Sequence, residues 1–259
     1  MKITTIILDW AGTTVDFGCF APVQAFMSAF QAYGIDPTVD ETRAPMGLAK
    51  RTHVAEMLSG KRLSGEWIKK HGKPHTEADI DEIYKKFEPE LFRVLRNYAS
   101  PLPGVLESVA QIKSMGIKIG STTGYTRQMM DIVAPLAKEK GYAPDCLICP
   151  EDVGGRGRPF PYMVWRNLES LECSHIGSVI KIGDTEADMQ EGKAAGCFCV
   201  GVITGSSVLG LNESEFDLHD GGCLDKRFAT AKQKYFDSGA DFVIDSIADL
   251  PKLIVSIGG

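Results

Sequence analysis

Short apolar runs rich in β-branched residues alternate with helical patterns along most of this chain, and this alternation restricts the fold more than any other feature. The strand-like runs are residues 3–8, 117–121, 179–182, 198–203 and 242–244, and helical patterns fall between most of them. Strands that alternate with helices form parallel sheets with helices on both faces. We therefore predict an α/β fold built on a doubly wound parallel sheet.

Residues 16–99 break the alternation, because they contain helical patterns and no convincing strand. Pro22 opens one such pattern, Leu48 to Leu58 form a second, and Thr76-Glu77-Ala78-Asp79 resembles a capping box that begins a third. We predict a helical domain of residues 16–99, inserted into an α/β domain of residues 1–15 and 100–259. Residues 205–239 are rich in Gly, Asp and Ser, and their structure is the least defined by the sequence.

Composition excludes several classes of protein. The 259 residues suffice for a core without disulfides or structural metals, and the net charge is -6 with no basic run, which argues against nucleic-acid binding. No apolar stretch approaches the roughly 20 residues of a membrane span, and the apolar N-terminal run ends at Asp9, too early for a signal peptide. We expect a cytoplasmic protein with no nucleic-acid or membrane partner.

Cysteine usage argues against a zinc site. The seven cysteines are odd in number and scattered. Two close pairs, Cys146/Cys149 and Cys197/Cys199, lie in apolar runs of strand character, without a second pair or a histidine cluster to complete a metal site. Buried thiols are the expected state.

Polar side chains follow three of the predicted strands at the point where each ends. Asp9 follows the first strand, Thr123 the second, and Asp184 with Asp188 the third. Arg158 adds a guanidinium group, which is always charged and whose planar set of donors suits phosphate. Ligands of open α/β sheets bind at the carboxyl ends of the strands. Each residue also has a structural interpretation, as a strand end, a polar turn, a helix cap or a surface arginine. Their succession along the chain favours a phosphate site.

The order of these residues resembles the pattern of the haloacid dehalogenase superfamily, whose members mostly transfer phosphoryl groups through an aspartyl-phosphate. The resemblance covers essentially the whole chain and implies a Rossmann-like core, with the helical insert as a cap domain. It also implies functional residues: a nucleophile, Asp9; phosphate-binding Thr123 and Arg158; Mg²⁺ ligands from Asp9, the Ala11 carbonyl and Asp184; and Asp188 as a support behind the ligands.

One position departs from the pattern of the superfamily's phosphatases. These enzymes usually carry a second Asp two residues after the nucleophile, as the acid for an oxygen leaving group. That position is Ala11 here, which cannot donate a proton, although its backbone carbonyl can still bind a metal. Either catalysis is impaired, or the leaving group needs no acid at this position.

The second alternative has support from four runs, residues 9–16, 19–22, 45–53 and 120–127, which look closely like those of the phosphonoacetaldehyde hydrolase family. Members of that family cleave a carbon–phosphorus bond and release acetaldehyde and phosphate. The resemblance implies that Lys50 is a Schiff-base lysine, that the substrate is a small phosphonate from 2-aminoethylphosphonate breakdown, and that the protein is a homodimer. We expect desolvation under the cap to lower the Lys50 pKa from its usual value near about 10.4.

Other residues of these runs keep two interpretations each. His53, three positions after Lys50, is either a proton shuttle at the imine or a structural hydrogen-bonding residue. We expect four residues to line the site or position the substrate: Met46, Gly47, Cys19 and Tyr125. A packing role would explain the presence of Met46 and Cys19 nearly as well. Lys50 by itself would be interpreted as a solvated lysine. In a dimer, Phe26 and Phe30 are candidate contacts, and they fit a cap core equally well.

Two rival functions remain at this stage. The first is a capped phosphatase or phosphomutase for a small phosphate ester, and Ala11 argues against it because an alkoxide would need the missing acid. The second is a binding module for phosphorylated metabolites that has lost turnover. The joint presence of Asp9, Asp184 and Lys50 argues against that loss.

Overall fold

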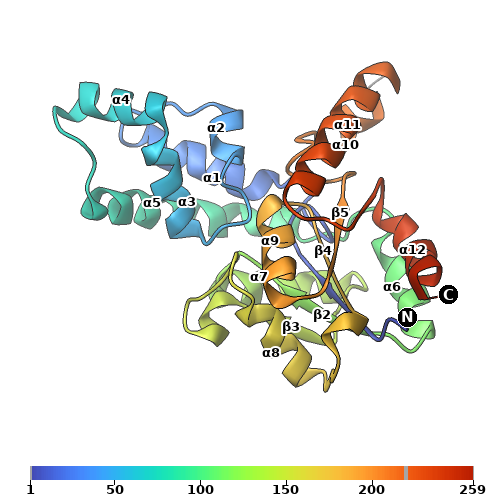
Figure 1. The fold of residues 1–259 in the computed structure, drawn as a ribbon. Coiled ribbons are helices and arrows are strands. Elements are labelled where there is room, and N and C mark those ends of the chain that lie inside the picture. Colours follow the sequence, from blue (N-terminus) through green and yellow to red (C-terminus); the bar gives the residue numbers. More distant parts are fainter. Residues whose placement is uncertain (1, 219–220, 259) are drawn as a thin grey trace.

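A computed structural model describes residues 2–218 and 221–258 of the chain (Figure 1). Six parallel strands form one sheet in the order β3-β2-β1-β4-β5-β6. The strands are β1 (Thr5–Leu8), β2 (Lys118–Thr122), β3 (Cys146–Ile148), β4 (Val179–Gly183), β5 (Phe198–Val202) and β6 (Phe242–Ile244). The predicted doubly wound α/β fold is confirmed. Only β3 lay outside the predicted strands, as part of the apolar run around Cys146.

Helices cover both faces of the sheet because side chains alternate along each buried strand. Ile6 and Leu8 of β1 belong to a cluster with residues of α6 (Val105–Ser114), α7 (Arg127–Glu139) and α12 (Leu250–Gly258). Ile7 points to the other face and packs with Val164 of α8 (Tyr162–Ser170). On that same face lie α9 (Glu186–Ala195) and α11 (Gly221–Asp237), preceded by the short α10 (Glu213–Leu218).

Five of the helices that lie between β1 and β2 in the sequence stand beside the sheet (Figure 1). We call these five helices and the loops between them the cap, and the rest of the structure the core. The cap helices are α1 (Phe20–Gln31), α2 (Val39–Arg43), α3 (Lys50–Ser59), α4 (Lys61–His71) and α5 (Glu77–Leu95). The expected capping box begins α5, where the Thr76 hydroxyl accepts the Asp79 N–H. The domain boundaries at residues 16 and 99 stay predictions.

Aromatic packing holds the cap together. The rings of Phe26 in α1 and Phe87 in α5 stack with centroids 4.0 Å apart, and both side chains are fully buried. Phe30 is also fully buried in the same cluster. Phe26 and Phe30 are therefore part of the cap core, which is one of the two interpretations that the sequence left open.

The chain crosses between core and cap twice, and the two crossings are bonded to each other. Val15 on the first crossing forms an antiparallel bridge with Pro101 on the second, and the Leu102 N–H donates to the Thr14 carbonyl at 2.9 Å. Any movement of the cap relative to the core must therefore bend the chain around this paired region.

The segment that the sequence left undefined, residues 205–239, is mostly helical where it is described. Within it, the Tyr235 hydroxyl is within hydrogen-bond distance of the carbonyls of Asp184, at 2.8 Å, and of Val202, at 2.9 Å. This contact fixes α11 against the carboxyl ends of β4 and β5. The six cysteines whose side chains are described are all free thiols, and Cys223 lies outside that set. In the described ranges, no helix has the length and apolarity needed to cross a membrane.

Replacement of Phe87 by alanine should destabilise the protein by about 3–5 kcal/mol, because it leaves a cavity against Phe26. Phe236→Ala is the matched control, since the Phe236 side chain is 49% exposed on α11, and it should cost less than about 1 kcal/mol. Urea unfolding followed by circular dichroism measures both. Equal losses for the two variants would contradict the packing described here.

Candidate active site

The carboxyl end of β1 places Asp9 between the ends of β2 and β4. The Asp9 N–H donates to the Ile182 carbonyl at 3.0 Å, which fixes the backbone, and the side chain is buried. Arg158 Nη2 donates to Asp9 Oδ1 at 2.5 Å and lies 2.9 Å from Asp188 Oδ1. The predicted arginine is thus buried against the predicted nucleophile, although 149 residues separate the two in the sequence.

Two further buried charges complete this network, and the sequence analysis missed both. Glu191 Oε2 accepts from Arg158 Nε at 3.1 Å and from the Thr122 hydroxyl at 3.0 Å. Lys181 Nζ forms an ion pair with Asp188. Lys181 is a lone charge inside an apolar strand, and Glu191 follows Asp188 by three helical positions, so both carried a signal in the sequence.

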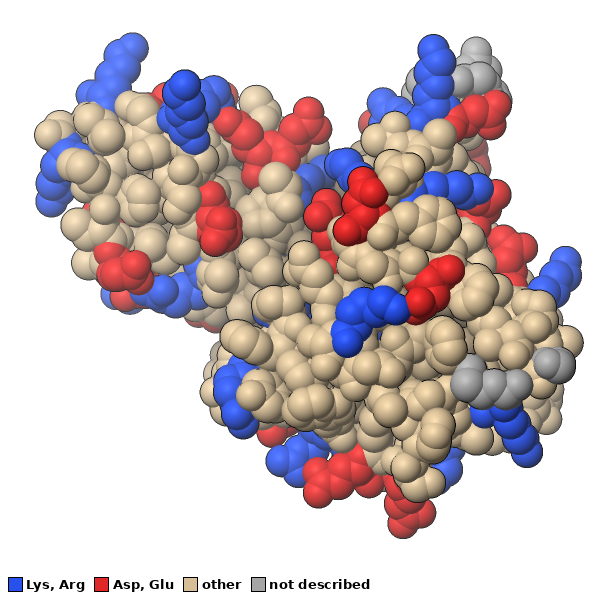
Figure 2. Space-filling view, in the orientation of Figure 1, with Lys and Arg blue, Asp and Glu red and all other residues tan. Residues whose placement is uncertain are grey.

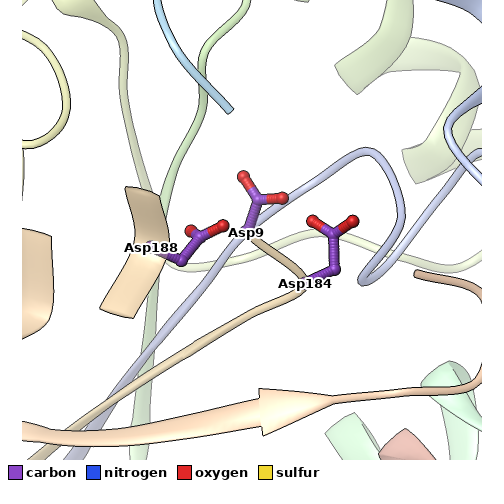
Figure 3. Close-up of side chains that lie close together, drawn as sticks. All are labelled: Asp9, Asp184 and Asp188. Atoms are coloured by element: carbon purple, nitrogen blue, oxygen red, sulfur yellow. The ribbon is translucent and has the colours of Figure 1, made fainter. Parts of the chain in front are cut away.

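Asp9, Asp184 and Asp188 form an acidic cluster in which one oxygen of each side chain lies within 4.8 Å of the others (Figure 3). Asp184 Oδ2 accepts the Ser207 N–H at 2.8 Å, whereas Asp184 Oδ1 is buried and has no partner within residues 2–218 and 221–258. An orphaned buried carboxylate oxygen is costly unless a cation binds it.

The charge of the buried network also fits a divalent cation. Four carboxylates (the acidic cluster and Glu191) face two cations (Arg158 and Lys181), which leaves two negative charges uncompensated within this network. Hard divalent cations prefer oxygen ligands. The acidic cluster can therefore hold a divalent metal ion.

Burial and mutual repulsion raise the pKa values of two of these carboxyls. The pKa of Asp184 lies well above the ordinary 3.8 because of desolvation and the charges of Asp9 and Asp188. Desolvation also raises the pKa of Asp9. Burial acts on Asp188 in the same direction, but the charges of Arg158 and Lys181 outweigh it and lower the Asp188 pKa.

Lys50, Asp9 and Asp184 border one small cavity, which we call the site cavity. It measures about 20 Å³, room for about one water molecule. Its walls come from cap and core together: Asp9, Ala11, Cys19, Met46, Gly47, Lys50, Thr123, Gly124, Tyr125, Arg158, Asp184 and Thr185. Every predicted site residue except His53 and Asp188 thus lines the site cavity, and Asp188 contacts Arg158 of its wall.

Lys50 is the first residue of α3, and the residue is only 5% exposed to solvent. Its Nζ lies 5.1 Å from the ring centroid of Tyr125 and 6.0 Å from that of Phe26. Burial lowers the Lys50 pKa from 10.5, as expected, although nearby Cys19 and Asp9 act in the opposite direction when charged. The residue is not a solvated lysine of the cap surface.

The other predicted contact residues lie on both sides of the site cavity. The Thr123 hydroxyl accepts the Tyr125 N–H at 3.0 Å, and the Tyr125 hydroxyl is buried without a partner among the described residues. Gly47 has φ 91°, and a Cβ there would lie 2.5 Å from the Thr185 hydroxyl oxygen. Glycine therefore allows the cap loop to contact the core. Burial, with the charges of Asp16 and Asp184, raises the pKa of the Cys19 thiol.

His53 lies behind the site cavity instead of lining it. Its Nε2 is 2.8 Å from the Thr42 carbonyl, so Nε2 carries the proton, and its ring stacks on Phe26 at 3.9 Å. Burial and the charge of Lys50 hold the His53 pKa well below 6.5. This geometry gives the neutral ring a structural contact with α2, and the proton-shuttle role stays a prediction.

Comparisons with known proteins show what this chain is similar to. The sequence pattern of the haloacid dehalogenase-like hydrolases matches residues 3–196. A phosphonoacetaldehyde hydrolase of Bacillus cytotoxicus is 48% identical over 98% of this chain and 96% of its own length. A bifunctional phosphonoacetaldehyde hydrolase/aminoethylphosphonate transaminase of Clostridioides difficile is 45% identical over 99% of this chain and 40% of its own. The crystal structure of a phosphonoacetaldehyde hydrolase-like protein from Oleispira antarctica has a TM-score of 0.96 at 37% identity, over 100% of this chain and 93% of that one.

Replacement of Asp184 by asparagine should make the metal-free protein more stable and abolish its response to divalent cations. The raised pKa means that the folded state disfavours the Asp184 carboxylate, so the metal-free protein loses stability as the pH rises above 3.8. Thermal unfolding at neutral pH measures this. A cation at a hundred times its dissociation constant should add about 2.7 kcal/mol to the wild type.

Asp131→Asn, at an exposed position of α7, is the control and should leave both the metal-free stability and the response to metal unchanged. A full metal response in Asp184→Asn would contradict the metal site.

Proposed function

The chain belongs to the haloacid dehalogenase-like hydrolases and, within them, to the phosphonoacetaldehyde hydrolase family, and we propose that it hydrolyses phosphonoacetaldehyde to acetaldehyde and phosphate. The observation that carries this proposal is the shared site cavity, in which a desolvated lysine of the cap faces a buried aspartate of the core. Ala11 supports it further, because the leaving group is carbon and needs no acid there.

Lys50 activates the carbon–phosphorus bond. A carbanion is a very poor leaving group, so the electrons of the breaking bond need an acceptor. The neutral amine of Lys50 condenses with the substrate aldehyde and releases water, and the resulting imine is protonated. When phosphorus departs, the bonding pair moves into this iminium ion and gives an enamine. Protonation of the enamine at carbon and hydrolysis then release acetaldehyde and return free Lys50.

Asp9 accepts the phosphoryl group. Its carboxylate attacks phosphorus and forms an aspartyl-phosphate, which water hydrolyses to phosphate and free Asp9. In this proposal the Arg158 guanidinium, 2.5 Å from Asp9, binds the phosphonate oxygens, and Thr123 of the same cavity wall donates a hydrogen bond to them. Glu191 and Asp188 hold the guanidinium in position.

We propose Mg²⁺ as the divalent ion, held by the carboxylates of Asp9 and Asp184 and the backbone carbonyl of Ala11, with Asp188 behind them. When bound, it offsets the repulsion between the Asp9 carboxylate and the phosphonate dianion. Asp188 pairs with Arg158 and Lys181, which suits a supporting position.

Four further residues of the cavity wall position the substrate in this proposal: Met46, Gly47, Cys19 and Tyr125. Because the site cavity holds about one water molecule, the cap must move away from the core to admit a substrate. The fused transaminase of the Clostridioides difficile relative supports a role in 2-aminoethylphosphonate breakdown. A homodimer and a cytoplasmic location complete the proposal.

Incubation with phosphonoacetaldehyde and borohydride should inactivate the protein and leave a reduced two-carbon adduct on Lys50, identified by mass spectrometry. Lys50→Arg should lose at least about 10³-fold in turnover, since a guanidinium does not form the imine. Lys69→Arg, at an exposed position of α4, should retain full activity. Phosphate release by Lys50→Arg would refute the imine route, and activity on sugar phosphates alone would indicate a phosphatase.

The rate of imine formation should rise with pH through the pKa of Lys50, because only the neutral amine attacks the aldehyde. Burial lowers this pKa, so the midpoint should lie below 10.5. Stopped-flow measurement of the burst of trapped adduct against pH tests this. A midpoint at or above 10.5 would show that Lys50 is not desolvated in solution.

A further inference from the structure

Arg43, the last residue of α2, joins three separate segments of the structure. Its Nη1 donates to the carbonyl of Gly18, on the first crossing between core and cap, at 2.6 Å. The same nitrogen donates to the carbonyl of Ser207, in the core loop that follows β5, at 3.2 Å. One cap side chain therefore contacts both the crossing and the core.

The core end of this contact leads directly to the acidic cluster. Ser207 accepts from Arg43 through its carbonyl and donates its N–H to Asp184 Oδ2 at 2.8 Å. The turn around it is fixed by its own hydrogen bonds, from Ser206 N to Ile203 O at 3.0 Å and from Gly210 N to Ser206 O at 3.1 Å. A shift of the Ser207 carbonyl would therefore move the amide that orients Asp184.

We propose that Arg43 is a positioning residue that latches the cap onto the core and, through Ser207, holds Asp184 in the orientation that leaves its second oxygen free for the metal ion. The inference rests on the proposed function for its role in turnover, but its structural consequences can be measured without substrate. Cap closure and the shape of the metal site are then two effects of one contact.

The surroundings of Arg43 allow the latch to open. Its Nε and Nη2 are buried without hydrogen-bond partners among the described residues, so opening the cap would let water bond them. Arg43 and Ser207 also line an open groove of about 610 Å³ between α2 and α11, in the hollow beside the α10–α11 region in Figure 2. Met46 and Thr185 line both this groove and the site cavity, so release of Arg43 frees the wall between them.

Three variants test the latch. Arg43→Gln removes the charge and the reach to both carbonyls, whereas Arg43→Lys keeps a cation whose three donors suit them. Arg62→Gln is the matched control, because Arg62 pairs with Glu41 of the same helix α2 and with Glu66 of α4, entirely within the cap. A loss of α2 stability alone would affect Arg43→Gln and Arg62→Gln alike.

The first readout is hydrogen–deuterium exchange of the metal-free protein in peptides that cover residues 203–210 and 15–20. Arg43→Gln should exchange faster in both peptides, and Arg43→Lys and Arg62→Gln should match the wild type there. The second readout is the Mg²⁺ dissociation constant from calorimetry, which should rise roughly tenfold in Arg43→Gln, as expected for the loss of a charged hydrogen bond. The value of kcat/KM for phosphonoacetaldehyde should fall with it.

Unchanged exchange at 203–210 in Arg43→Gln would overturn the latch, and so would an equal change in Arg62→Gln. A weaker Mg²⁺ affinity without faster exchange would also overturn it, because the effect would not pass through Ser207. Failure of the wild type to release acetaldehyde would refute the proposed function while leaving the exchange and affinity results to decide the latch.

Discussion

Burial of unbalanced negative charge at one edge of the sheet is the constraint on which the rest of this structure depends. Asp9, Asp184 and Asp188 meet there because the ends of β1 and β4 are adjacent in a parallel sheet. Carboxylates out of water are costly unless cations face them. Arg158 and Lys181 supply part of the balance, and the orphaned oxygen of Asp184 is available to a further cation.

Burial under the closed cap also changes the pKa values of the site residues. Loss of water raises the pKa values of Asp9 and Asp184 and lowers that of Lys50, because burial disfavours every charged form. A less charged lysine is what imine chemistry requires, and metal binding keeps the aspartates ionised. In the proposed mechanism, the closed cavity therefore favours the neutral amine of Lys50, while the proposed metal ion keeps the Asp9 carboxylate ionised.

Much of this arrangement could be predicted from sequence, since strand alternation and polar residues at strand ends are local signals. Asp9, Thr123, Arg158 and Asp184 were placed by that logic. The short strand β3 was recognised only as an apolar run of strand character and was left out of the predicted sheet, because three residues, Cys146–Ile148, give little periodicity. Lys181 and Glu191 were missed because their sequence signals, a lone charge in an apolar strand and a helical spacing from Asp188, do not identify the partners of the two charges.

Contacts between cap and core could not be predicted from local sequence patterns. Arg43 resembles any helix-terminal arginine in sequence, and its partners at positions 18 and 207 are backbone carbonyls, which carry no side-chain signal. His53 illustrates the converse limit. Its spacing from Lys50 placed both on one face of α3, yet packing on Phe26 and a bond to the Thr42 carbonyl turn its ring away from the site cavity.

In the proposed mechanism, Lys50 and Asp9 act in sequence on one substrate molecule. Borohydride trapping in an Asp9→Asn variant tests it most directly, because the imine should form while the carbon–phosphorus bond stays intact. Mass spectrometry should then find a phosphonoethyl group on Lys50, where the wild type yields an ethyl group. An ethyl adduct in Asp9→Asn would contradict the account, since the bond would have broken without its nucleophile, and so would the absence of any adduct in a folded variant.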